Sequence, residues 1–402
     1  MNPLFKEAIP ILEHLEYHGY EAYFVGGAVR DELLNRSISD IDIATSAPPE
    51  EVVKLFEKTV PVGIEHGTVL VRHKQKSFEV TTYRIESGYE DYRHPDKVDF
   101  VKDLHLDLSR RDFTINAMAM NKNGDIIDPF HGQSDLKSNT IKTVNEAAGR
   151  FQEDPLRMMR ALRFVSQLGF SLEERTKEAI MEYGYLLEKI AVERLAIEME
   201  KLWLGKHIQQ AHQHLVHTDI YRFLPCFNKD HDLVHKSQLH VKTPFSSLSE
   251  AITCMHLFNE SFTIDYWCKE WKLSNAVKKD SLQLLQAFQA YMQYKELRPD
   301  ILYQLQPQLL QPFAHLTTIL IGEHVISEAD LQMQYDHLPI KSRNDLAING
   351  NDILKLKPEE RPGPWIQELI KSLESKVLFG TVKNNKEELQ EWVRAWNRQE
   401  KG

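Results

Sequence analysis

The stretch VGGAVRDELLNRSISDIDIAT, residues 25–45, says most about the fold of this chain. Its glycine pair, Gly26 and Gly27, directly follows the apolar run EAYFV, which we predict to be a short strand. Further along, SDIDIAT alternates polar and apolar residues as a strand does, so Asp40 and Asp42 should project from the same face. Two neighbouring carboxylates repel each other unless a cation lies between them. Mg²⁺ suits such a pair, because it takes oxygen ligands and shares its coordination with substrate phosphates.

The same stretch also fits an exposed strand preceded by an ordinary tight turn. For a lone Asp-x-Asp pattern that interpretation would be the better one, because short motifs match by chance. Here the glycine pair, an Arg-Asp dipeptide beginning at Arg30, and Asp-x-Asp follow one another closely. Glycine lets backbone N–H groups approach phosphate oxygens, and Arg30 lies within reach of the same charge. The combination predicts a phosphate and magnesium site made of Gly26, Gly27, Arg30, Asp40 and Asp42.

Length and composition indicate a globular protein of several domains. The chain has 402 residues, of which 42% are apolar and 27% charged, and this length favours two to four domains. No apolar run approaches the roughly 18 residues that cross a membrane, and the first residues lack the plan of a signal peptide. The three cysteines are odd in number and lack zinc-finger or CxxC spacing, so reduced thiols in a cytoplasmic protein are expected.

The net charge limits how the chain can meet nucleic acid. A formal charge of −10 argues against indiscriminate binding to a polyanion. It leaves room for a local basic groove, because phosphate contacts depend on where the charges lie.

Strand and helix patterns divide the chain into a mixed first part and a helical remainder. Over the first roughly 145 residues, short alternating runs are interleaved with helical ones; beyond about residue 150 the periodicity is almost wholly helical. We therefore expect an α/β head followed by all-α regions. The expected domains are a head over 1–147, a neck over 148–210, a body over 211–305 and a tail over 306–402.

Taken with other segments, the opening stretch resembles a known family. GGAVRD…DIDIAT looks like the signature of the polymerase-beta-like nucleotidyltransferases, in the branch that holds bacterial CCA-adding enzymes (tRNA nucleotidyltransferases) and poly(A) polymerases. The segments that agree in order are SRRDFTINAMA (109–119), DPFHGQSDL (128–136), EDPLRMMRALRF (153–164) and ERLAIE (193–198). The resemblance implies a nucleotidyltransferase fold for the head, with a small mixed sheet flanked by helices. It also implies an all-α neck, body and tail that bind tRNA.

The resemblance further implies nucleotidyl transfer by two metal ions. One cation, held by Asp40 and Asp42, would lower the pKa of an RNA 3′-hydroxyl, and the other would bind the triphosphate and stabilise the leaving pyrophosphate. Glu79 lies in SFEVTTYR, where related folds often place a third carboxylate. An ordinary strand residue facing solvent is an equally good interpretation of Glu79.

The segment RRDFTIN supplies further residues for the nucleotide. Arg111 resembles the nucleotide-contacting arginine of the family. Asp112 and Asn116 are four residues apart and could share a helix face near the ribose. For Asp112, capping of that helix is equally open.

The segment EDPLRMMRALRF predicts a helix start followed by a stripe of arginines. Asp154 fits the N-cap position, and Pro155 fits the first turn. Successive residues of a helix are rotated by about 100°, so residues three apart lie about 60° from each other around the helix axis. Arg157, Arg160 and Arg163 should therefore form a stripe that runs along one side of the helix. The residues left for the core are Met158, Leu162 and Val165.

The hydrogen-bonding groups at the start of this helix can be compared with those on the Watson–Crick edges of the bases. Cytosine and adenine both present an amino donor beside a ring-nitrogen acceptor, and uracil and guanine present the reverse. Asp154 could accept from the amino group while Arg157 donates to the ring nitrogen, the carboxylate also holding the guanidinium in place. The family resemblance agrees, since this motif there acts as a protein template. Arg160 and Arg163 would hold Arg157 and the base or reach the phosphates; a basic face that meets RNA backbone or acidic neighbours is the alternative.

Several related activities share these motifs. YRIESGYEDYRHPDKVDF (83–100) resembles the flexible loop of full CCA-adding enzymes, so we expect stepwise addition of C, C and A to tRNA from CTP and ATP with Mg²⁺. Poly(A) polymerase is the runner-up, although the last residues lack a long basic extension; CC-adding or A-adding enzymes also stay open. A non-catalytic RNA-binding descendant would have no use for Asp40, Asp42 and Arg111. No membrane or protein partner is expected.

Three further patterns in the sequence predict no catalytic role. The histidines of residues 207–217 lack metal-ligand spacing and predict a polar helix face; they are His207, His212, His214 and His217. His231-Asp232 lacks the further residues of HD-type phosphohydrolases. The aromatic residues at helical spacing are expected in the core rather than stacked on bases; they are Tyr266, Trp267 and Trp271.

Overall fold

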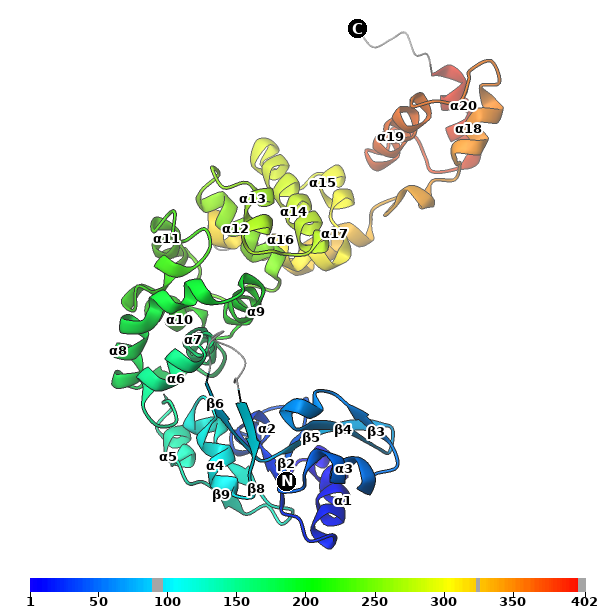
Figure 1. Cartoon of the computed structure of the whole chain (residues 1–402). Coiled ribbons are helices and arrows are strands. Elements are labelled where there is room, and N and C mark those ends of the chain that lie inside the picture. Colours follow the sequence, from blue (N-terminus) through cyan, green and yellow to red (C-terminus); the bar gives the residue numbers. More distant parts are fainter. Residues whose placement is uncertain (89–96, 323–325, 397–402) are drawn as a thin grey trace. The chain divides into compact units, whose positions relative to one another are not determined.

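The computed structural model describes residues 1–88, 97–322 and 326–396. The chain divides into two compact units, Met1–Pro244 and Phe245–Gly402. The first unit begins with strands and helices and continues as helices, and the described part of the second unit is helical (Figure 1). The expected order of an α/β head followed by helical regions is confirmed.

The head contains a mixed sheet, seven-stranded within the described ranges, in the order β3-β4-β5-β2-β1-β8-β9. Its strands are β1 (Ala22–Val25), β2 (Asp42–Thr45), β3 (Thr59–Pro61), β4 (Thr68–His73), β5 (Lys76–Thr82), β8 (Ala119–Met120) and β9 (Ile126–Ile127). Strands β2 and β5 pair in parallel, and the other neighbours pair antiparallel.

Strand β2 is shorter than the alternation of SDIDIAT predicts, because it begins at Asp42 and leaves Asp40 before it. On one side, pairing of β2 stops because its neighbour β1 ends at Val25, opposite Asp42. Gly26 then turns the chain away at a φ of 73°, so no strand remains on that side to pair with residues before Asp42. The flanking Ile41 and Ile43 are buried, as predicted.

Short helices complete the head. They are α1 (Pro3–Tyr17), α2 (Gly27–Leu33), α3 (Pro49–Leu55), α4 (Leu104–Ser109) and α5 (Gly132–Lys137). Helix α1 buries an apolar face against the sheet, where the rings of Phe5 and Phe24 meet edge to face at 4.8 Å. Helix α3 contacts both α1 and strands β4 and β5 (Figure 1). These helices pack on the sheet and so hold the end of β1 and the start of β2 in place.

The predicted flexible loop over 83–100 is described only at its ends. Strands β6 (Arg84–Ser87) and β7 (Lys97–Phe100) form an antiparallel pair with Arg84 opposite Phe100. Residues 89–96 lie outside the described residues.

The rest of the first unit is mainly helical. Its helices are α6 (Ala147–Glu153), α7 (Leu156–Leu168), α8 (Glu174–Tyr183), α9 (Val192–Trp203), α10 (Ile208–His217) and α11 (Asp232–His240), and β10 (Thr140–Ile141) pairs with β11 (Ser171–Leu172). Helix α7 packs against α9 and α10. It buries Met158, Leu162 and Val165, as predicted, and ends at Gly169, whose φ is 74°. This packing fixes which side of α7 its arginines occupy.

Histidine His212 does not lie on a polar helix face, so that prediction is wrong for this residue. Its side chain is buried on α10, and Nε2 lies 3.1 Å from the hydroxyl of Ser237 on α11. Burial, with a smaller contribution from Lys242, lowers the pKa of His212 to about 3. The imidazole is therefore a neutral member of the core.

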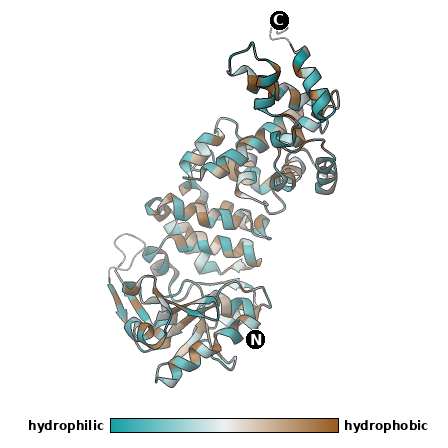
Figure 2. Ribbon diagram, turned by 90° about the vertical axis from the view of Figure 1, so that its right-hand side faces the viewer, coloured by the Kyte–Doolittle hydropathy of each residue, from teal (hydrophilic) through white to brown (hydrophobic). Residues whose placement is uncertain are grey.

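The second unit packs amphipathic helices around apolar side chains. They are α12 (Leu248–Phe258), α13 (Ile264–Glu270), α14 (Asn275–Tyr294), α15 (Pro299–Gln304), α16 (Leu310–Ile321), α17 (Glu328–Asp336), α18 (Gly350–Leu356), α19 (Trp365–Leu378) and α20 (Lys386–Ala395). Many helices carry both hydrophobic and hydrophilic faces (Figure 2). Trp267 and Trp271 are buried, as predicted. Tyr266 is only half-buried, so the prediction is wrong for this residue. Within the described ranges, no helix combines the length and apolar character needed to span a membrane.

Short 3-10 helices link these elements. They are η1 (Ile64–His66), η2 (Thr114–Asn116), η3 (Gly184–Lys189), η4 (Ile220–Phe223), η5 (Pro307–Leu309) and η6 (Arg343–Asp345).

Candidate active site

A pocket of about 740 Å³ in the first unit gathers nearly all the residues selected from the sequence. The predicted site residues that line it are Gly26, Gly27, Arg30, Asp40, Asp42, Arg111, Asp112, Asn116, Asp154, Arg157, Arg160 and Arg163. Glu79 is not among its lining residues. The turn after β1, the start of β2, the segment around η2 and helix α7 therefore meet at this pocket.

The turn after β1 leaves little room for a side chain at Gly26. A Cβ atom there would lie 3.0 Å from Nη1 of Arg111 and 3.5 Å from Oδ2 of Asp42. The φ of 73° is also one that residues with a side chain rarely adopt. Glycine is thus favoured by the backbone geometry and by the close approach of Arg111, whereas Asp42 lies at an ordinary contact distance.

The carboxylates form a crowded acidic group at the same place. Asp40 and Asp42 both line the pocket, and the parallel register of β2 and β5 places Glu79 beside Asp42. Desolvation raises the pKa of Asp42; Arg111 opposes this rise and the charge of Asp40 adds to it. Burial and the charges of Asp42 and Asp40 likewise raise the pKa of Glu79. A cation held by Asp40 and Asp42 would relieve this repulsion.

Of the acidic group, only Asp40 and Asp42 line the pocket, so the pocket offers two carboxylates to a metal ion. Among the described residues, no set of three or more histidine, cysteine, aspartate or glutamate side chains is arranged to hold a metal ion. A cation at Asp40 and Asp42 would thus need further ligands from substrate or water, as Mg²⁺ commonly does.

Arg111 lies against this acidic group with part of its donor capacity unused. Its Nη2 atom lies 3.4 Å from Oδ2 of Asp107, and Nε has no hydrogen-bond partner in the described part of the chain. Burial lowers the pKa of Arg111, while the charge of Asp107 opposes that shift. A buried, incompletely paired guanidinium in a pocket suits an anionic ligand.

Asp112 is buried and fully hydrogen-bonded. Its Oδ1 accepts from the backbone N–H of Phe113 (2.8 Å) and from Nδ2 of Asn116 (3.1 Å). Its Oδ2 accepts from Nε (2.8 Å) and Nη2 (2.6 Å) of Arg160. Burial acts to raise the pKa of Asp112, but Arg160 and the bond from Asn116 outweigh it and hold the pKa well below its usual value.

The predicted shared helix face of Asp112 and Asn116 is wrong, although the two side chains do meet. Helix η2 spans only Thr114–Asn116, so Asp112 precedes it, and η2 has no side-chain cap. Asn116 in turn accepts from Nη1 of Arg30 at 2.7 Å. A continuous chain of hydrogen bonds thus runs from Arg30 on α2 through Asn116 and Asp112 to Arg160 on α7.

At the start of α7 the carboxylate partners differ from the predicted ones. The N-cap of α7 is Pro155 rather than the predicted Asp154, although Oδ1 of Asp154 accepts from the backbone N–H of Leu156, the first residue of the helix, at 3.1 Å. The expectation that Asp154 also holds Arg157 is wrong. Its Oδ2 accepts from Nη2 of Arg194 on α9 at 2.9 Å, whereas Arg157 donates to Oε2 of Glu153 at 2.7 Å. The cause is the extended backbone at Asp154, which ends α6 and directs its side chain to α9.

The other arginines of α7 do not hold Arg157 either. Arg160 is bound by Asp112, and Arg163 forms an ion pair with Glu198 at 2.9 Å. Burial and the charge of Arg160 lower the pKa of Arg163 to about 10, with Glu198 opposing the shift. The alternative interpretation, an arginine face that meets acidic neighbours, describes both residues.

Phe164 forms an aromatic platform beneath these cations. The guanidinium carbon of Arg163 lies 4.3 Å from its ring centroid, that of Arg30 5.0 Å, and that of Arg160 5.8 Å. The negative face of an aromatic ring attracts cations. Phe164 therefore helps to keep three like-charged groups close together.

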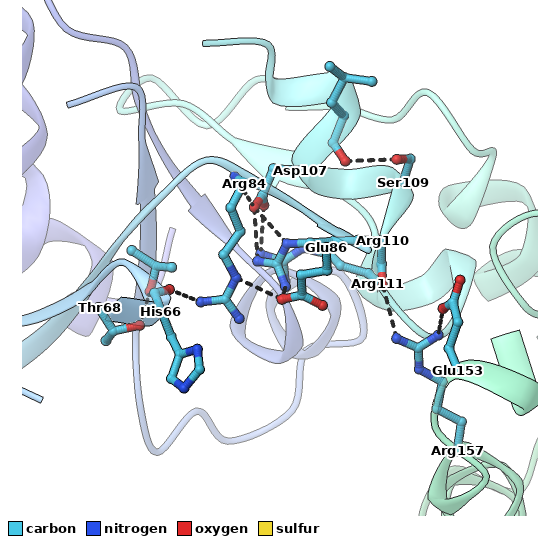
Figure 3. Close-up of polar contacts among 12 residues, drawn as sticks. His66, Thr68, Arg84, Glu86, Asp107, Ser109, Arg110, Arg111, Glu153 and Arg157 are labelled. Carbon is cyan, nitrogen blue, oxygen red and sulfur yellow. Dashed lines mark hydrogen bonds and ion pairs between the residues drawn. The ribbon is translucent and has the colours of Figure 1, made fainter. Parts of the chain in front are cut away.

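The sequence interpretation missed an ion-pair network that borders the pocket (Figure 3). Glu86 on β6 lies 2.7 Å from Nε of Arg84 and 3.1 Å from Nη1 of Arg110. Arg110 also pairs with Asp107 at 2.8 Å, and its carbonyl oxygen accepts from Nη2 of Arg157 at 3.2 Å (Figure 3). The network links the β6–β7 pair to helix α7. Its partners lie 24 and 47 residues apart, so no local pattern could have joined them.

Comparisons with family models cover both units. The model of the poly(A) polymerase head domain matches residues 22–142, and that of tRNA nucleotidyltransferase domain 2 matches residues 245–393. A third, described as "Probable RNA and SrmB- binding site of polymerase A", matches residues 169–230.

Curated relatives extend over nearly the whole chain. The CCA-adding enzyme of Anoxybacillus flavithermus is 47% identical over 396 residues, which cover 98% of each chain. That of Oceanobacillus iheyensis is 44% identical and covers 97% of each. Among solved structures, the Bacillus stearothermophilus CCA-adding enzyme in complex with CTP has 38% identity and a TM-score of 0.85, with 98% of this chain and 97% of that one covered. With such identity along almost its entire length, the chain belongs to the family of CCA-adding enzymes.

Proposed function

We propose that this chain adds C, C and A stepwise to the 3′ end of tRNA, using CTP and ATP and releasing pyrophosphate. The observation that best supports this is the composition of the pocket. It joins a carboxylate pair suited to a divalent cation with buried arginines suited to phosphates and a helix that offers both an acceptor and donors to a base. The relatives at 47% and 44% identity are named for the same activity.

Asp40 and Asp42 would hold Mg²⁺ in this reaction. The raised pKa of Asp42 and the unused ligand positions of a two-carboxylate site support that assignment. When bound, Mg²⁺ activates the RNA 3′-hydroxyl and neutralises charge on the triphosphate. Arg111, whose guanidinium lies against the glycine turn, binds the triphosphate, and that turn brings backbone close to the same phosphates. Arg30, Asn116 and Asp112 form the polar wall for the ribose.

Asp154 and Arg157 read the base in this proposal. A carboxylate has several acceptor sites, so the bond from Arg194 leaves capacity on Asp154. Arg157 donates to Glu153 and to the carbonyls of Arg150 and Arg110, which use three of the five N–H groups of a guanidinium and leave capacity for a base edge. Cytosine and adenine each present an amino group, which donates to Asp154, beside a ring nitrogen, which accepts from Arg157. Uracil or guanine would leave buried polar groups unpaired, which costs about 1–3 kcal/mol for each group. The pair therefore favours cytosine and adenine.

The division of labour follows the four predicted regions. The head over 1–147 carries out transfer, the neck over 148–210 reads the base, and the regions over 211–305 and 306–402 bind tRNA. The reaction takes place in the cytoplasm, which agrees with three free cysteines. Poly(A) polymerase is the second candidate, because the head matches the poly(A) polymerase head-domain model.

One assay tests the proposal. The protein is incubated with tRNA that ends at the discriminator base and with CTP, ATP, UTP or mixtures, with and without Mg²⁺, and 3′ ends are sequenced. Addition of two C and then one A, only with Mg²⁺, is the expected result. A long A tract would instead make the protein a poly(A) polymerase. Retained tRNA binding without any addition would make it a non-catalytic RNA-binding protein.

A variant tests the base-reading role separately. Asp154→Ala combined with Arg157→Ala should raise incorporation of U relative to C at least tenfold, since each lost pairing group contributes about 1–3 kcal/mol of discrimination. The affinity for tRNA should stay within twofold of the parent protein. Unchanged base choice together with a large loss of tRNA binding would refute the assignment.

A further inference from the structure

A second pocket, of about 620 Å³, adjoins the nucleotide pocket in the first unit. Arg30, Gln167 and Lys201 line both pockets, so the two share a wall. The remaining lining comes from the segment around Arg36, from the ends of α7 and α9, and from Lys206. None of the sequence motifs pointed to this second pocket, and the proposed nucleotide contacts use only Arg30 of its lining residues.

The charge of the second pocket is positive although the whole chain is acidic. Its lining has the cations Arg30, Arg36, Lys201 and Lys206 and the acids Asp31 and Glu200. Arg30 is paired with Asp31 at 2.9 Å, and Arg36 donates to the carbonyl of Gln167 at 3.3 Å. In contrast, the exposed ammonium groups of Lys201 and Lys206 make no hydrogen bond or ion pair with any residue the structure describes.

Helix α9 connects these lysines to the base-reading end of the nucleotide pocket. Arg194, Glu198 and Lys201 stand at positions i, i+4 and i+7, so they share one face of the helix. Arg194 bonds to Asp154, and Glu198 pairs with Arg163. The same face that supports the base-reading residues therefore ends at the unpaired Lys201, where the second pocket begins.

We propose that this second pocket holds phosphodiester groups of the 3′ strand of tRNA while its terminal hydroxyl lies at the nucleotide pocket. This inference rests on the proposed function. The glycine turn and the Asp40–Asp42 pair do not line the second pocket, so a nucleoside triphosphate bound at them does not need it. Unpaired lysines are suited to phosphates regardless of sequence, and the phosphate backbone is common to every tRNA. The exposed Leu204 adds an apolar rim for a sugar or a base.

The test uses the full chain with Lys201→Gln and Lys206→Gln combined. Equilibrium binding of 3′-truncated tRNA is measured across a salt series, and KM values for tRNA and CTP are measured in the addition reaction. Each lost phosphate contact should lower the salt slope of the affinity by about 0.7–0.9, so the double variant should lose about 1.5. The affinity for tRNA should fall about tenfold at low salt, while KM for CTP should change less than twofold.

The matched control is Lys137→Gln with Lys189→Gln. It removes the same charge from exposed lysines of the first unit that line neither pocket, and it should leave the salt slope unchanged. Since Lys201 lines both pockets, Lys206→Glu alone serves as a second variant, and it too should weaken tRNA binding.

Three outcomes would overturn the inference. These are an unchanged tRNA affinity and slope, an equal loss in the control, or a raised KM for CTP with unchanged tRNA binding, which would make the second pocket a triphosphate site. If the parent protein binds tRNA but adds no nucleotide, the proposed function fails while the binding comparison still decides the role of this pocket.

Discussion

At the scale of single residues, the backbone conformation of Gly26 is directly coupled to the position of Arg111, which we propose to bind the triphosphate. Its φ of 73° and the 3.0 Å separation between a Cβ atom and Arg111 make Gly26→Ala doubly unfavourable. We expect it to destabilise the first unit by about 1–3 kcal/mol through backbone strain. It should also lower kcat/KM for CTP about 100-fold, because Arg111 must move. Chemical unfolding and steady-state kinetics measure the two effects.

Gly149→Ala is the matched control for Gly26→Ala. Gly149 lies within α6 at an ordinary φ, and nothing lies within 4 Å of a Cβ atom there. Alanine should stabilise this helix by about 0.4–1 kcal/mol and leave kinetics unchanged. Equal losses in both variants would show that the turn after β1 has no special role.

The carboxylates support a second prediction at this scale. Asp42→Asn should lower the rate of nucleotide addition at least 1000-fold, since it removes a cation ligand beside the reacting groups. Affinity for tRNA should remain within about threefold. Glu79→Gln is the comparison: Glu79 is the register partner of Asp42 but does not line the pocket, so its effect should stay below tenfold. Single-turnover assays measure both rates, and equal losses would make Glu79 a third ligand.

These residues also show where sequence patterns suffice. The glycine pair follows β1 directly, and Asp40 and Asp42 lie just before and at the start of β2, so the closeness of the two carboxylates follows from local geometry. The bond between Asp154 and Arg194 spans 40 residues and depends on how α9 packs on α7. No periodicity records such a contact. Glu153 and Asp154 both lie within four residues of Arg157, so the sequence alone does not say which carboxylate pairs with it. The break between α6 and α7 at Asp154 makes Glu153 the partner of Arg157.

At the scale of elements, helix α7 combines an apolar core face with an arginine stripe. Its periodicity predicted the helix and its buried side. Each arginine then takes a carboxylate from a different element: Arg157 from α6, Arg160 from the segment before η2, and Arg163 from α9. Burying several guanidiniums costs much free energy unless each is paired, so these elements must pack correctly before the stripe can exist. The sequence indicated the stripe but not its partners.

The β6–β7 pair reaches this helix through Glu86, and this yields the third prediction. Glu86→Gln removes the carboxylate between Arg84 and Arg110, whose charges then repel each other. The backbone of Arg110 should shift, and with it the carbonyl that binds Arg157. We expect misincorporation of U in place of C to rise about fivefold to tenfold, equivalent to about 1–1.4 kcal/mol. Competition between CTP and UTP measures this ratio.

Asp99→Asn is the control within the same strand pair. Asp99 lies on β7 and pairs with Lys97 at the surface, so its loss should leave base choice unchanged. Base choice that is unaffected by Glu86→Gln would mean that the strand pair does not position Arg157.

At the scale of the whole molecule, the nucleotide pocket and the neutral His212 both belong to the first compact unit. In the folded state the pKa of His212 is about 3, below its ordinary value of 6.5. The unfolded chain therefore binds more protons between these values, and stability falls as the pH drops through this range. From pH 7 to pH 5 this residue should cost the first unit about 2 kcal/mol.

His212→Asn should remove this part of the acid sensitivity, whatever its effect at neutral pH. The pH dependence of the free energy of unfolding is the measurement. His217→Asn, on an exposed position of the same helix, should retain the sensitivity of the parent protein. An identical pH slope in all three proteins would exclude a buried neutral His212.

The division into two units leads to the last prediction, which concerns the intact chain. Each unit has its own apolar core, so calorimetry should resolve two unfolding transitions. The transition that His212→Asn makes less acid-sensitive belongs to the first unit. CTP with Mg²⁺ at about 100 times its Kd should stabilise that transition by about 2.7 kcal/mol and leave the other in place, because every residue lining the pocket precedes Pro244. Asp42→Asn should weaken this shift, since it removes part of the cation site, and Gly149→Ala should keep it in full. A nucleotide-induced shift of both transitions together would mean that the units unfold as one and that binding at the first stabilises the second.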